Sequence, residues 1–150
     1  MQRNAVCPLC SRLTPGYTFR TRSYGNLEEQ NVPHVMVEGP CTVEQFHTTF
    51  TAVQWTVDGA ILKLRDSFLN TTRAEVLVEA VVVEGKRMQS FFISLSQRRN
   101  GVIAKLPIVT DPEKTEGVKR LIACVGGLLK QQSPTCAYGQ TNLHPYLGAS

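Results

Sequence analysis

Alternating apolar and polar residues predict a series of strands in the middle of the chain. In residues 52–57, two valines and Trp55 fall on one side and smaller or polar residues on the other, which is the two-residue period of a half-buried strand. Asp58-Gly59 follows directly, and this pair tolerates the positive φ angles of a tight hairpin turn. Comparable runs with turn residues between them predict four more strands, over residues 60–66, 74–83, 87–96 and 102–109.

A helix is expected on each side of these strands. Thr42 and Gln45 have the spacing of a capping box before a short apolar run, which predicts a helix over residues 42–50. Thr110 and Glu113 have the same spacing ahead of the second helix. That helix is predicted from one apolar stripe, made of Val118, Leu121, Ile122, Val125, Leu128 and Leu129.

The predicted fold class is α+β: a five-stranded antiparallel meander flanked by a short N-terminal helix and a C-terminal amphipathic helix. This element order is similar to that of pleckstrin-homology-like and kinase-associated C-terminal domains, although no motif residue accompanies the similarity. We expect a single α+β domain over residues 40–131. Residues 1–39 are then an extended arm, and residues 132–150, which carry no charged side chain, a flexible tail.

Composition places the chain among globular proteins, with 42% hydrophobic and 19% charged residues. No apolar run approaches the roughly 18 residues of a transmembrane helix, and the start lacks the pattern of a secretory signal. Five cysteines, an odd number, favour reduced thiols and an intracellular protein, cytoplasmic or nuclear. The first 27 residues hold four arginines and no acidic residue, so organelle import is the alternative, although Pro8 and Pro15 oppose the helix of a transit peptide.

Cys7-Pro8-Leu9-Cys10 is the most suggestive motif. Two thiolates at this spacing form half of a structural zinc site. The missing ligands would have to come from His34, Cys41 or His47, whose spacings do not form a second pair of this kind. Free thiols in the arm and a redox pair are the two other interpretations, and no cofactor is expected unless the zinc interpretation holds.

Four arginines are expected to meet at one end of the sheet. In a meander, alternate turns lie at the same end, so the loop of residues 66–73 and the turn of residues 97–101 should be neighbours. Guanidinium groups clustered in this way suit the phosphates of RNA or of an anionic lipid. The alternative is that the strand ends are merely solvated. The candidate anion-binding residues are Arg65, Arg73, Arg98 and Arg99.

One face of the predicted sheet is less polar than an exposed face should be. Leu77 and Val81 on the third strand and Phe92 on the fourth are expected to share it. Such a face calls for a cover, supplied either by the N-terminal arm or by another protein chain in a homo- or hetero-oligomer. Leu77, Val81 and Phe92 are therefore the candidate interface residues.

The sequence contains no P-loop, nucleophile elbow or zinc-protease motif, and its three histidines are widely separated. We therefore expect a non-catalytic protein-interaction module, a small subunit or accessory factor of a larger complex. The alternative is a phosphate-recognising module that binds RNA or anionic lipid through the arginine cluster.

Overall fold

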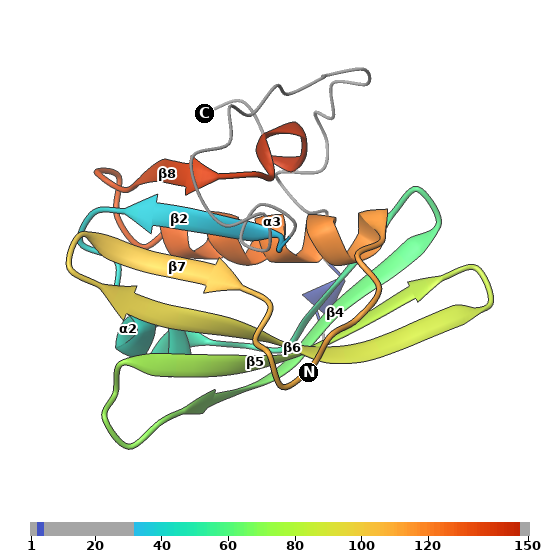
Figure 1. Ribbon diagram of the computed structural model, residues 1–150, viewed down its shortest axis with the longest axis horizontal. Coiled ribbons are helices and arrows are strands. Elements are labelled where there is room, and N and C mark those ends of the chain that lie inside the picture. Colours follow the sequence, from blue (N-terminus) through green and yellow to red (C-terminus); the bar gives the residue numbers. More distant parts are fainter. Residues whose placement is uncertain (1–2, 5–31, 148–150) are drawn as a thin grey trace.

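The protein is a mixed α+β structure in which an antiparallel sheet curls around one long helix (Figure 1). The computed structural model describes residues 3–4 and 32–147. The strands are β1 (Arg3–Asn4), β2 (His34–Glu38), β3 (Val53–Val57), β4 (Ala60–Leu69), β5 (Glu75–Glu84), β6 (Arg87–Arg98), β7 (Gly101–Lys105) and β8 (Ala137–Thr141). The helices are α2 (Val43–Thr49), α3 (Glu116–Lys130) and the short 3-10 helix η2 (His144–Tyr146).

The strand order in the sheet is β1-β3-β4-β5-β6-β7-β2-β8. Strands β3 to β7 follow one another as antiparallel neighbours, and the two-residue β1 pairs in parallel with β3. The Asp58-Gly59 turn is present, with φ angles of 50° and 79°, as the hairpin pattern requires. An antiparallel sheet with two α-helices is thus confirmed.

The sheet has more than the five predicted strands. β2 lies between β7 and β8, so residues expected to form the arm and the tail contribute strands. β2 is held there because Val35 and Val37 alternate into the core and are fully buried. β8 carries the weaker pattern Ala-Tyr-Gly-Gln-Thr and gains its place by pairing with β2. With these added strands, the expected pleckstrin-like element order is not supported.

The first helix begins where the sequence predicts. Thr42 Oγ1 accepts a hydrogen bond from Gln45 N at 3.1 Å, which is half of the expected capping box. The reciprocal bond is replaced, because Thr42 N donates to Gln132 Oε1 at 3.0 Å. A residue beyond α3 therefore fixes the start of α2.

The second helix begins later than predicted. Thr115, with its side chain accepting from Val118 N, is the N-cap of α3. Thr110 Oγ1 accepts a hydrogen bond from Phe92 N, and Glu113 pairs with Arg87. The capping-box prediction at Thr110–Glu113 is wrong because both side chains bind β6 instead of a helix terminus.

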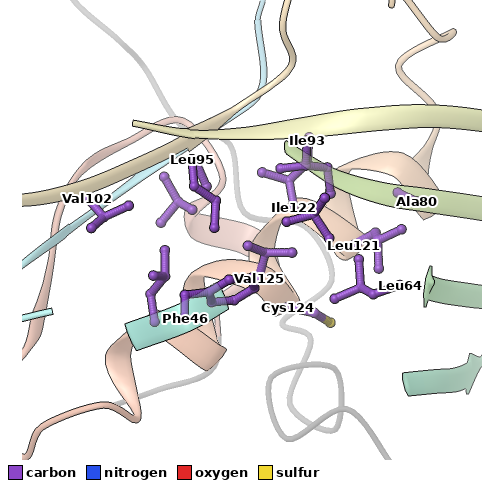
Figure 2. Close-up of a cluster of buried hydrophobic side chains, with 14 of the residues drawn as sticks. Phe46, Leu64, Ala80, Ile93, Leu95, Val102, Leu121, Ile122, Cys124 and Val125 are labelled. Carbon is purple, nitrogen blue, oxygen red and sulfur yellow. The ribbon is translucent and has the colours of Figure 1, made fainter. Parts of the chain in front are cut away.

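The core lies between α3 and one face of the sheet, and Figure 2 shows its central cluster. Glycines allow the helix to sit close to the strands. A Cβ built on Gly126 would lie 2.7 Å from Val35 Cγ1, and one on Gly117 would lie 2.6 Å from Val82 Cγ1. The predicted apolar stripe faces this core, and Gly117 and Gly126 pack closely on the strands.

Candidate functional site

The outer face of the sheet, which we define as the face turned away from α3, carries the candidate interface residues. Along β5, Val76, Val78, Ala80 and Val82 enter the core, so Leu77 and Val81 point the other way. Phe92 of β6 is paired with Glu79, in the row between these two residues. Leu77, Val81 and Phe92 therefore share the outer face, with Val81 buried and the other two partly buried.

Phe68 joins this face and was not expected from the sequence. β4 continues to Leu69, and a register shift between Leu64 and Asp66 turns Phe68 outward, opposite Leu77. Phe68 is 50% exposed, and its ring meets that of Phe92 edge-on at a centroid distance of 6.4 Å. Phe68, Leu77 and Phe92 form what we call the apolar strip.

A shallow hollow lies further along the same face. Lys63 on β4 pairs with Val81 on β5, and Val81 pairs with Ser90 on β6, so one row of residues crosses its floor. Met88, which is 67% exposed, lines it from β6. Its volume is about 250 Å³, and we call it the cationic hollow; it is lined by Lys63, Arg65, Val81, Met88 and Ser90.

The two cations of the hollow differ in their partners. Arg65 Nη1 lies 3.6 Å from Glu79 Oε1, in a pair that is largely open to solvent on the arginine side. Lys63 is partly buried, and among the residues that the structure describes no carboxylate lies within ion-pair distance of it. The wall formed by β4 thus presents one ammonium group that is not neutralised within residues 32–147.

The connection from β7 to α3 borders this face. It is tied to β6 by the Thr110 bond to Phe92 N and by a reciprocal pair of hydrogen bonds between Gln89 and the backbone of Glu113. At its turn, Ile108 and Val109 are exposed at 101% and 78%. Apolar side chains on a firmly anchored turn add to the uncovered apolar surface near β6.

The four candidate anion-binding arginines are not brought together. Gln97 N donates to Ala74 O at 2.8 Å, which places the turn that carries Arg73 beside the end of β6 with Arg98 and Arg99. Arg65 instead lies within β4, because that strand runs past the predicted end at residue 66. Arg73 is also engaged, at 3.8 Å from Glu44 of α2.

The zinc hypothesis concerns Cys7 and Cys10, which lie outside the described residues. The three residues considered as further ligands have separate contacts. His34 Nδ1 donates to Val32 O at 3.0 Å, and His47 Nδ1 lies 2.7 Å from the hydroxyl of Ser67. Over the part of the chain that the structure describes, no group of three His, Cys, Asp or Glu side chains is arranged to hold a metal ion.

Cys41 belongs to a buried thiol pair with Cys136, next to the β2–β8 pairing. Cys41 Sγ donates to Val37 O at 3.4 Å, and the Cys136 thiol is its neighbour. Burial, and secondarily the neighbouring Cys136, raises the pKa of Cys41 to about 11. Since the nucleophilic form of cysteine is the thiolate, a thiol that stays protonated at neutral pH suits packing better than reaction.

Comparisons with known proteins found no relative: no protein-family model, no curated protein and no solved structure matches the chain. Among the described helices, none is long and apolar enough to cross a membrane. Function is therefore inferred from the chemistry of the surfaces described above.

Proposed function

We propose that this chain is a non-catalytic protein-interaction module that binds its partner through the outer face of the sheet. The observation that carries the proposal is the exposed apolar strip, above all Phe68, which is half exposed although it is paired with Leu77 inside the β4–β5 hairpin. Together with Met88 it leaves two large apolar side chains open to water on one face. Exposed apolar surface of this kind is typical of docking sites.

Half of Phe68 stays exposed in the folded chain, so only part of its burial free energy contributes to folding. Full burial of a Phe or Met side chain is worth about 1.5–3 kcal/mol, so covering the exposed parts of Phe68 and Met88 would contribute roughly 2 kcal/mol to binding. A chain that folds without burying these groups still has that free energy available for a partner. The strand-built surface around them offers room for an extended protein segment along β5.

The alternative function, recognition of phosphate in RNA or lipid, ranks second. Arg98 and Arg99 are exposed and have no ion pair with a described residue, which favours it. Arg73 is paired with Glu44, and Arg65 lies elsewhere on the sheet, so the cluster is smaller than the four residues expected. Phosphate binding would weaken steeply with salt and would be lost in Arg98→Glu/Arg99→Glu.

Capture of partners from cells that express the protein tests the proposal. The full chain is compared with Phe68→Ser and Leu77→Lys at moderate salt, with and without nuclease, and each variant is first shown to unfold at the parent's temperature. Gln45→Ala is the control, since it changes an exposed side chain on α2, which packs against the core and not on the outer face. A stoichiometric protein that survives nuclease and is lost only in the two sheet variants supports the proposal. Equal capture by all variants refutes it, and loss on nuclease treatment favours the arginine alternative.

A further inference from the structure

The cationic hollow and the apolar strip lie on one face at a defined spacing. Val81 in the hollow and Leu77 in the strip are four residues apart on β5, which corresponds to about 13 Å at roughly 3.3 Å per residue. Both side chains point outward, because their positions along β5 differ by an even number, four. A second extended segment lying along β5 would bring its own residues i and i+4 to these two positions.

The chemistry of the hollow favours an acidic side chain. At about 250 Å³ it is smaller than the roughly 300–1,000 Å³ of sites for drug-sized ligands, and its size suits a single side chain. Its floor is the buried Val81, and Lys63 and Arg65 stand at the β4 side. A carboxylate placed there would neutralise the Lys63 ammonium and could accept from Arg65 donors that Glu79 leaves unused.

We propose that the partner contacts this face with an extended peptide segment that carries an acidic residue four positions from a large apolar residue. The acidic side chain enters the cationic hollow, and the apolar one packs on Phe68, Leu77 and Phe92. This inference rests on the proposed function and specifies the partner that it requires. A protein in trans is favoured over the chain's own first 31 residues, because these hold four arginines and only two acidic residues, Glu28 and Glu29.

Selection from a displayed library of random twelve-residue peptides tests this pattern directly. The full chain is the target, with Lys63→Met and Phe68→Ser as parallel targets. Lys114→Met is the matched control, since it removes the charge of an exposed lysine in the connection before α3. We expect peptides in which Asp or Glu lies four positions before or after Leu, Ile or Phe, recovered by the parent and the Lys114 variant.

Synthetic copies of a selected peptide, with its acid intact or replaced by the matching amide, then give the affinities by fluorescence anisotropy. Lys63→Met is expected to weaken the acidic peptide about tenfold, which is the effect of losing one charge-assisted hydrogen bond at a partly buried site. Lys63→Met should leave the affinity for the amide peptide unchanged. In a double-mutant cycle, Lys63→Met and the replacement of the peptide acid by its amide should therefore be coupled. Peptide affinity that rises in Glu28→Gln/Glu29→Gln would show that the chain's own segment occupies the hollow, and would overturn the assignment to a partner.

The proposed interaction face and the proposed acidic pattern of the peptide are refuted by different results. If Phe68→Ser abolishes peptide binding while Lys63→Met has the parent's affinity and selects the same peptides, the acidic pattern is wrong and the interaction face stands. If no peptide is selected, or if all variants bind alike, both are wrong. Self-association of the parent that Phe68→Ser abolishes, measured by sedimentation, would identify a second copy as the occupant and would likewise overturn the peptide assignment.

Discussion

Replacing Gly126 by alanine tests how closely α3 must approach β2. The added Cβ would lie 2.7 Å from Val35 Cγ1 and 3.1 Å from Cγ2, and Val35 is fully buried. Its β-branched side chain is stiff at χ1, so it cannot easily turn aside. Alanine gains about 1 kcal/mol of helix propensity over glycine, whereas overpacking a core costs about 1–3 kcal/mol. Because 2.7 Å is well inside ordinary carbon–carbon contact, we expect a net loss of about 1–2 kcal/mol in the free energy of unfolding.

Urea unfolding followed by circular dichroism measures this loss, and a double-mutant cycle with Val35→Ala identifies its cause. Val35→Ala removes the two methyl groups that the new Cβ would meet, so the double variant should be more stable than the sum of the single effects by about 1–2 kcal/mol. Gly126→Ala with unchanged or raised stability, or a cycle without coupling, would refute the close packing of α3 on β2 as the reason for a glycine here.

Three further outcomes follow from the same structure. Gly101→Ala places a Cβ 1.9 Å from Val37 O and should destabilise the fold by more than about 3 kcal/mol in the same urea assay, since a strand rather than a flexible side chain must move. Burial raises the pKa of Cys41 from 9.0 to about 11, so the unfolded chain loses this proton first as the pH rises. The contribution of Cys41 to stability is therefore complete below pH 9 and is lost between pH 9 and 11, by on the order of 2 kcal/mol. Urea titrations of Cys41→Ala should show a flatter pH profile in that window. Thr115→Ala should cost about 1 kcal/mol as an N-cap loss, and equal stability of variant and parent would place the helix start elsewhere.

The sequence predicted the meander well because its signals are local. The Asp58-Gly59 turn sets the first hairpin, and the alternation of strands β5 and β6 leaves little freedom in their register. The outward positions of Leu77, Val81 and Phe92 follow from that alternation alone. Local pattern therefore sufficed to predict which consecutive strands pair, although not every boundary or register.

Features that depend on distant contacts were not predictable. Phe68 faces outward because of a register shift in β4, which no local pattern marks. Thr110 has the spacing of an N-cap, but its hydroxyl accepts a hydrogen bond from the backbone N–H of Phe92. The N-cap of α3 is therefore Thr115. The cationic hollow combines side chains of three strands, and its grouping becomes visible only once their pairing is known.

The position of β2 between β7 and β8 also determines when this part of the sheet can form during folding. Glu38 pairs with Gly101 on one side and with Ala137 on the other, so both neighbours of this early strand come much later in the chain. Such distant pairings close long loops and slow folding. During synthesis, β2 gains its second neighbour only once β8 has been made, and a chain interrupted before residue 137 would leave one edge of β2 open to pairing with other molecules. Premature termination should thus yield aggregation rather than a smaller working domain.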